Sequence, residues 1–87
     1  MTHTIQITDF AYDPNLLTIS VGDSVQWTNR DSFGHTATRT DPPPFDTGLI
    51  AQDTTSAPIT FNSKSPTEGL EYYCKPHPHM RGRIVVQ

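Results

Sequence analysis

The 87-residue sequence contains a single cysteine, so no disulfide can form within the chain. Small extracellular domains often use disulfides in place of a large hydrophobic core, and that solution is excluded here. A lone thiol is a buried structural group, a catalytic nucleophile or a metal ligand. Cys74 taken alone does not decide between these roles.

Hydrophobic residues are also scarce, at 33% of the chain, whereas soluble domains have about 45–50%. The core is therefore thin, and a metal that bound only the folded state would stabilise it. No apolar run approaches the ~20 residues that cross a membrane. We expect one small domain over residues 1–87, without a membrane span. The net charge of −3 disfavours nucleic acid and anionic membranes as partners.

No stretch keeps a helical period. Short runs of apolar and β-branched residues alternate with turn residues, a pattern typical of all-β proteins. Inward-facing pairs are expected in the first and third strands, Ile5 with Ile7 and Val25 with Trp27, and residues 12–15 are expected to form a turn. In the second strand Leu17, Ile19 and Val21 are expected to share a face. Further strands are expected over residues 35–40, 57–62, 70–74 and 81–87. Seven to eight strands at this spacing predict a Greek-key β-sandwich or barrel.

The most informative segment is CKPHPHM, residues 74–80, which places a thiol, two imidazoles and a thioether within seven residues. Two imidazoles, one thiolate and a weak axial Met describe an electron-transfer copper site. This segment offers Cys74, His77 and Met80, and His35 is the natural donor of the second imidazole. Zinc takes the same Cys and His donors tetrahedrally and is the chemical alternative.

The strand that leads into this segment predicts the direction in which Cys74 points. Leu70, Tyr72 and Cys74 share a face by alternation, so Cys74 points inward if the other two do. Pro76 and Pro78 fix φ on both sides of His77 and lower the entropy lost on ordering the loop.

One upstream His followed by a terminal Cys-x-x-His-x-x-Met resembles the cupredoxins, the type 1 blue copper proteins, with the amicyanin- and plastocyanin-like branch nearest. Residues 10–14, 17–29 and 69–74 are also similar to that family. The resemblance implies a cupredoxin-like fold and a single copper ion held by His35, Cys74, His77 and Met80.

The same resemblance implies an electron carrier that cycles between Cu(II) and Cu(I), is not an enzyme, is monomeric and binds redox proteins transiently. A copper-delivery module and a fragment of a copper oxidase are the alternatives. The chain is either cytoplasmic or a periplasmic (extracytoplasmic) domain whose signal or anchor is absent from this sequence. We favour the second, because a copper–thiolate site suits a compartment outside the cytoplasm.

Three positions depart from the family pattern. Thr36 stands where many members have Asn after the upstream ligand, and its hydroxyl is expected to tie the two ligand loops together. Gly34 resembles the azurin-like branch, in which that carbonyl lies near copper. His79 stands where an apolar residue is expected, which argues against the usual hydrophobic docking patch. It is interpreted as a solvent-exposed loop residue, and the alternatives are a pH-sensitive group near the electron-transfer surface or an alternative ligand.

Overall fold

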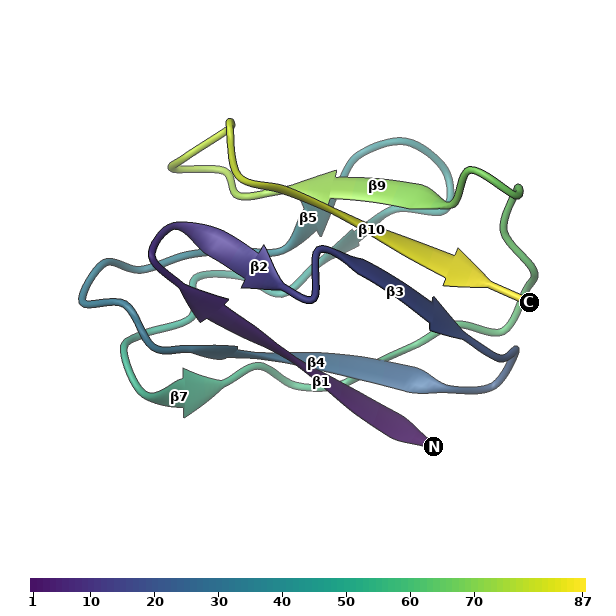
Figure 1. The fold of residues 1–87 in the computed structure, drawn as a ribbon, viewed down its shortest axis with the longest axis horizontal. Helices are drawn as coiled ribbons and strands as arrows, with labels where there is room; N and C mark the ends of the chain where they lie inside the picture. Colours follow the sequence, from purple (N-terminus) through teal and green to yellow (C-terminus); the bar gives the residue numbers. More distant parts are fainter.

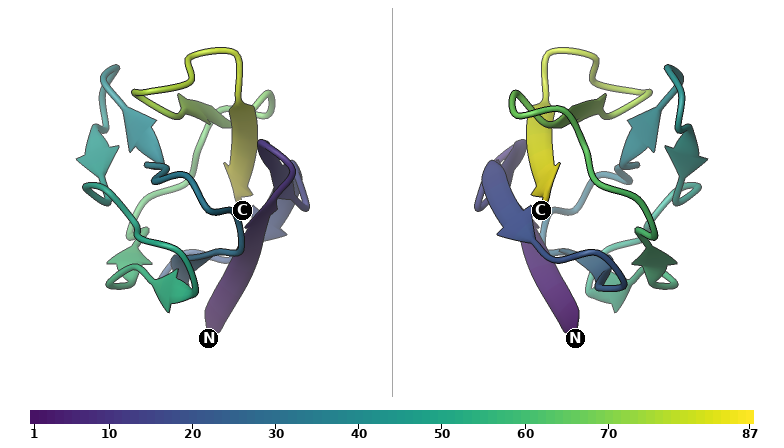
Figure 2. Two further views of the ribbon diagram at one scale, coloured as in Figure 1. Left: turned by 90° about the vertical axis from the view of Figure 1, so that its left-hand side faces the viewer. Right: turned by 90° about the vertical axis from the view of Figure 1, so that its right-hand side faces the viewer.

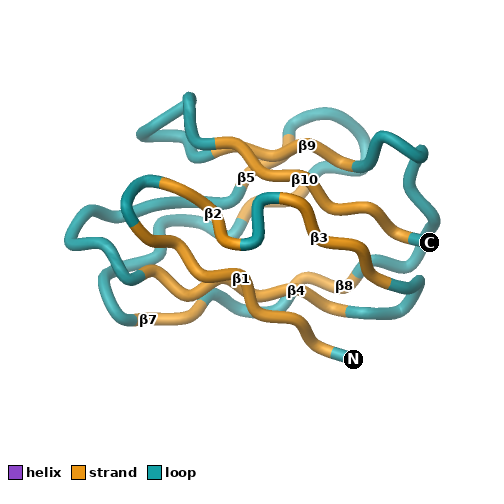
Figure 3. Tube along the Cα trace, viewed as in Figure 1, coloured by secondary structure: helices purple, strands orange, loops and turns teal.

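A computed structural model describes residues 1–87 as two β-sheets packed face to face, without a helix (Figures 1 and 3). The first sheet has the order β2 (Ala11–Asp13), β1 (Thr2–Thr8), β4 (Ser24–Asn29), β7 (Thr54–Thr55), and β8 (Ile59–Thr60) also pairs with β4. The second has the order β3 (Leu16–Ile19), β10 (Arg81–Val86), β9 (Leu70–Tyr73), β5 (Thr38–Arg39), β6 (Phe45–Asp46). The end views show the sheets curving around a shared interior, which confirms the predicted sandwich (Figure 2).

The first half of the core consists of the inward-facing residues of β1 and β4. Ile5 and Ile7 of β1 and Val25 and Trp27 of β4 are all fully buried, as predicted. The two strands run parallel, with Ile5 opposite Trp27 in the register. Residues that are opposite in a sheet share a face, so both strands present their apolar side chains to the same interior.

The second half of the core comes from β9 and β10. Leu70 and Tyr72 of β9, and Cys74 directly after it, are buried as predicted. Gly82 lies opposite Tyr72 in the antiparallel register, and its missing side chain leaves room for the tyrosine ring. The Trp27 indole N–H donates to the Tyr72 hydroxyl at 3.2 Å. This hydrogen bond links the two sheets and provides a partner for two polar groups buried in the core.

The structure differs from the predicted pattern at two residues. Tyr12 was expected in a turn, but it is buried in the edge strand β2, and its hydroxyl donates to the Thr36 carbonyl. Val21 was expected on the core face but is 45% exposed. The chain has already left the sheet at Val21, since β3 ends at Ile19 and a turn with Gly22 at φ 94° follows.

The shortest strands lie between residues 38 and 60. There are ten strand segments in total, and four of them, β5 to β8, contain only two residues each. The strand expected over residues 35–40 is reduced to Thr38–Arg39. Three consecutive prolines at 42–44 cannot donate to a ladder, so this edge of the sheet cannot be continuous.

Three loops meet at the end of the sandwich opposite the C-terminus (Figure 1). They are the β1–β2 turn, the β4–β5 loop that carries His35, and the β9–β10 loop that carries His77. The β-topology therefore brings distant parts of the sequence to one end. The structure has no helix of the length and apolarity needed to cross a bilayer.

Asp23 joins the start of β1 to the turn that precedes β4. The His3 imidazole donates to its carboxylate at 2.9 Å, and the Ser20 backbone N–H donates at 3.1 Å. The hydrogen bond from His3, followed by that from Ser20, lowers the pKa of Asp23 to about 2.

This shift predicts an acid-dependent loss of stability. The folded-state pKa lies below the ~3.9 of an unfolded aspartate, so the stabilisation is complete above about pH 4 and is lost as the pH falls toward 2. We expect Asp23→Asn to lose less stability than the wild type across this interval, measured by urea unfolding of the metal-free protein. Asp41→Asn, which removes no ion pair or hydrogen bond of the structure, is the matched control. Equal acid slopes for Asp23→Asn and the wild type would contradict the assignment.

Candidate metal centre

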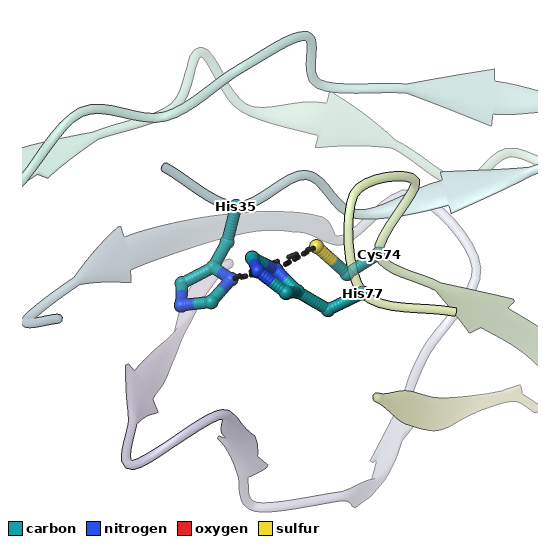
Figure 4. A group of neighbouring side chains, drawn as sticks. All are labelled: His35, Cys74 and His77. Atoms are coloured by element: carbon teal, nitrogen blue, oxygen red, sulfur yellow. Dashed lines mark hydrogen bonds between the residues drawn. The ribbon is translucent and has the colours of Figure 1, made fainter. Parts of the chain in front are cut away.

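Three donor atoms from two loops converge at the end of the sandwich (Figure 4). The Nδ1 atoms of His35 and His77 are 3.2 Å apart, and each lies 3.6 Å from the Sγ atom of Cys74. A point equidistant from all three atoms is about 2.0 Å from each, the length of a metal–imidazole bond. The donors therefore already have the spacing of a trigonal metal site.

The loop from Cys74 to Met80 is held by its own backbone. The Cys74 carbonyl accepts from the His77 N–H at 3.2 Å, and the His77 carbonyl accepts from the Met80 N–H at 2.9 Å. The Cys74 N–H in turn donates to the Met80 carbonyl at 3.2 Å. Pro76 and Pro78 have no N–H to satisfy, and they restrict φ between these turns. Met80 is 5% exposed, so its side chain is buried at the end of the loop.

His35 is fixed by backbone pairing with a residue of the loop between β6 and β7. Its N–H and carbonyl pair with Ile50 in an isolated β-bridge, at 3.3 and 2.7 Å. The side-chain amide of the fully buried Asn29, at the end of β4, donates to the Phe33 and Ile50 carbonyls. One amide therefore links the segment before His35 to the residue that faces His35 across the bridge, and the imidazole has no exposed surface.

Asp31 sets the tautomer of His35. The His35 Nε2–H donates to the Asp31 carboxylate at 2.8 Å, which leaves the lone pair of Nδ1 directed to the donor cluster. Partial burial alone would raise the pKa of Asp31, but hydrogen bonds from the Phe10 and Asp9 N–H groups and from His35 outweigh it. The pKa of Asp31 therefore lies below its usual range.

The same carboxylate orders the β1–β2 turn. Asp9 and Phe10 have φ of 59° and 57°, a conformation that is uncommon for residues other than glycine. Their N–H groups donate to Asp31 at 2.7 and 2.9 Å and stabilise the turn. The Phe10 ring consequently lies edge-on to both imidazoles, with centroids 5.2 Å from His35 and 4.9 Å from His77.

Backbone and hydroxyl groups surround the thiol. Cys74 is fully buried, and the Thr36 N–H donates to its Sγ at 3.4 Å. The Thr36 hydroxyl accepts from the Lys75 N–H at 3.0 Å and also hydrogen-bonds to Thr38, which donates to Asp46. The expectation that Thr36 ties the two ligand loops together is therefore confirmed.

This contact predicts the effect of replacing Thr36. Thr36→Val keeps the side-chain shape but leaves the Lys75 N–H without its acceptor, and we expect a loss of about 1–2 kcal/mol of stability. The readouts are chemical denaturation of the metal-free protein and amide exchange at Lys75. Thr36→Ser retains the hydroxyl and is the control. A Val variant that matches the Ser variant in both readouts would show that the hydroxyl does not join the loops.

The sequence predicts His35, Cys74 and His77 as metal ligands, and the structure brings their donor atoms together. His79 is exposed and lies outside this cluster, as its interpretation as a loop residue implies. Sequence reasoning missed Asp31, whose signal was a carboxylate four residues before the upstream His. It also missed Phe10 and Phe33, which are 43% and 57% exposed and bring apolar surface to His77 despite His79.

The fold and the donors define a small β-sandwich with a buried, soft-metal site of two imidazoles and one thiolate. A family model described as copper binding proteins, plastocyanin/azurin family, matches residues 1–87. The chain therefore belongs to the plastocyanin/azurin family of copper-binding proteins, which confirms the predicted family, fold and metal.

Individual relatives agree with this assignment. The chain is 29% identical to amicyanin from Paracoccus denitrificans over 95% of its length, and 36% identical to plastocyanin from Synechococcus sp. (strain JA-2-3B'a(2-13)) over 86%. It spans only 63% and 62% of the lengths of these two proteins. The reduced Cu(I) form of an amicyanin variant at pH 4 superposes with a TM-score of 0.89 at 27% identity, covering 99% of this chain and 82% of that one.

Proposed function

We propose that residues 1–87 form a single domain that carries one electron at a time at a type 1 copper site. His35, Cys74, His77 and Met80 would hold the copper ion. The observation that supports this most strongly is the mutual spacing of 3.2 to 3.6 Å between the donor atoms of His35, Cys74 and His77. Bound copper supplies the one-electron couple between Cu(II) and Cu(I).

The chain's own residues keep the donors in place. The Asp31 carboxylate orients His35, and the Thr36 N–H hydrogen-bonds to the Cys74 sulfur. The loop that carries His77 and Met80 is closed by its own backbone hydrogen bonds. Donors that do not move between two charge states keep the reorganisation energy low, and this suits rapid electron transfer.

Electron exchange with a partner is assigned to the surface around His77. His77 is the half-buried imidazole, whereas His35 is fully enclosed. Phe10, Phe33 and Leu49 are 43%, 57% and 70% exposed, and the first two have ring centroids within 6.4 Å of the His77 ring. A small apolar surface next to a polar ligand suits brief docking of a redox protein.

As a carrier, the domain has no catalytic residue, is a monomer and acts in the periplasm or another extracytoplasmic compartment. One cluster of donors is sufficient for a carrier, whereas a copper oxidase needs a second cluster for substrate. The location follows from the copper–thiolate chemistry, which suits a compartment outside the cytoplasm.

Repeated redox cycling with metal analysis tests the proposal. The copper-loaded protein is reduced with ascorbate and reoxidised with ferricyanide several times in the presence of a Cu(I) chelator, and bound copper is measured after each cycle. A carrier retains one copper per chain and regains its Cu(II) spectrum. Loss of copper on reduction would indicate a delivery module instead, and a second tightly bound copper with substrate turnover would indicate an oxidase.

A further inference from the structure

A partly open cavity set apart from the donor cluster lies beside the triple proline, at an edge of the sandwich. It has a volume of about 220 Å³ and is bounded by the β5–β6 hairpin, by β8 and by the segment 62–66 that follows it. Phe45, Ile59, Phe61 and Leu70 form its apolar walls. The loops that line it lie toward the end of the molecule that holds the C-terminus, away from the ligand loops (Figure 1).

Two unpaired cations line this cavity. The chain has six Lys and Arg side chains, and four of them make ion pairs, namely Arg30, Lys75, Arg81 and Arg83. The remaining two, Arg39 and Lys64, have no carboxylate partner, and both line the cavity. In a protein with a net charge of −3, the only two cations without a counter-charge therefore occur at the same place.

Arg39 is also incompletely hydrogen-bonded. Its terminal nitrogens donate to the Glu71 and Pro42 carbonyls at 3.0 and 3.2 Å, and neither acceptor carries a formal charge. Its Nε–H is buried and is the only buried side-chain polar atom of the molecule without a partner. A buried donor on a cation is costly to leave unsatisfied, so this N–H favours an anionic acceptor.

The register of the hairpin directs Arg39 toward the apolar walls. Arg39 lies opposite Phe45 in the β5–β6 pair, and opposite residues share a face of the sheet. Phe45 packs against Trp27 and Phe61, with ring centroids 5.9 and 5.5 Å away. The arginine stem therefore leaves the hairpin on the side of the aromatic core.

We propose that this cavity binds a small hydrophobic monocarboxylate. Its apolar body packs on Phe45, Phe61 and Ile59, and its carboxylate accepts from Arg39 and lies near the Lys64 ammonium. The volume is below that of a site for a drug-sized ligand, so a single ring or a short aliphatic chain suits it. A phosphate would lose more hydration among these walls and has no apolar body to bury.

This site is separate from the metal centre. None of the residues that line the cavity is His35, Cys74, His77 or Met80. The carboxylate is therefore expected to bind the copper-free and the Cu(I)-loaded protein with the same affinity. This property also distinguishes cavity binding from a carboxylate that coordinates the metal.

Titration followed by ¹H–¹⁵N NMR tests the proposal, with benzoate as the probe and benzyl alcohol as its neutral counterpart. We expect saturable shifts at Phe45, Phe61 and the Arg39 Nε–H, with a dissociation constant in the millimolar range, as for other ligands of this size. Benzyl alcohol, which lacks the charge, is expected to bind about tenfold more weakly.

Three variants sharpen the result. Arg39→Met should weaken benzoate about tenfold and leave benzyl alcohol unchanged. Lys64→Gln lies on an exposed loop, tolerates substitution if Arg39→Met does not fold, and should weaken benzoate about two- to threefold. Arg81→Met removes an arginine outside the cavity and should change nothing. Equal binding of the two probes would overturn the proposal. So would the absence of saturation, or shifts confined to Tyr73 and Arg81 in the neighbouring surface hollow.

Discussion

Replacing Gly82 by alanine is expected to destabilise the protein by about 3 kcal/mol or more, because the new methyl group overpacks the core. The methyl would lie 2.8 Å from the Tyr72 Cε1 atom and would overlap its Cζ and hydroxyl oxygen. Tyr72 is fully buried and its hydroxyl accepts from Trp27, so the ring cannot move without breaking a core hydrogen bond. A thermal midpoint lower by roughly 12–24 °C is expected for a domain of this size, measured by circular dichroism of the metal-free protein.

Gly34→Ala is the matched control for this substitution. The three atoms nearest to its methyl would all belong to the Leu49 side chain, at 3.0 to 3.2 Å, and Leu49 is 70% exposed and free to rotate away. We expect a much smaller change. In addition, the double variant Gly82→Ala/Tyr72→Leu should lose less stability than the sum of the single variants, because the clash needs the distal ring atoms. Additive losses, or equal losses for Gly82→Ala and Gly34→Ala, would contradict this description of the core.

Removal of either imidazole is expected to abolish the intense visible absorption of the Cu(II) protein, but only one loss should be reversible. His77 is half-buried beside the surface, so His77→Gly opens a space that external imidazole can enter. His35 has no exposed surface and is enclosed by the Asn29 and Ile50 contacts, so His35→Gly leaves a sealed cavity. Loss of a direct ligand should weaken Cu(II) binding beyond the about 10–100-fold that follows loss of an outer hydrogen-bond partner.

The measurement is an imidazole titration of each variant in the presence of one equivalent of Cu(II), followed by visible absorption. Restoration in His77→Gly and none in His35→Gly is the expected result. His79→Gly is the control, since that imidazole is exposed and lies outside the donor cluster, and its spectrum should match the wild type. Restoration in both ligand variants, or in neither, would show that the assignment of the outer ligand is wrong.

Much of the core was predictable because the alternation of apolar and polar residues alone determines which side chains of a strand face inward. This pattern correctly predicted that Ile5, Ile7, Val25 and Trp27 are buried. It also predicted that Cys74, directly after β9, faces the interior. The donor set was predictable for a different reason. Cysteine, histidine and methionine at short spacing have few structural roles in common, so their chemistry limits the choice of metal.

The support of the site was less predictable, because it depends on contacts between loops. Asp31 acts on His35 and on the β1–β2 turn together, and the second contact requires positive φ at Asp9 and Phe10. Neither residue is a glycine, so no composition signal indicates this backbone conformation. The apolar surface beside His77 was missed for the same reason, since Phe10 reaches it only through that turn.

The short edge strand β2 was also not predicted from the sequence. Tyr12 lies in the short edge strand β2, between the turn at Asp9 and Phe10 and the bend at residues 14–15, so only the second half of the turn expected at 12–15 is observed. Thr36, in contrast, was predictable, because a hydroxyl next to the upstream ligand can accept from the opposite loop in much the same way as an amide.

The central claim is that His35, Cys74, His77 and Met80 form a type 1 copper site, and the most direct test is the visible spectrum after one equivalent of Cu(II) is added to the metal-free protein. We predict an intense thiolate-to-copper charge-transfer band that saturates at one copper per chain and is absent in Cys74→Ser. A colourless complex, or a band that persists in Cys74→Ser, would contradict the account.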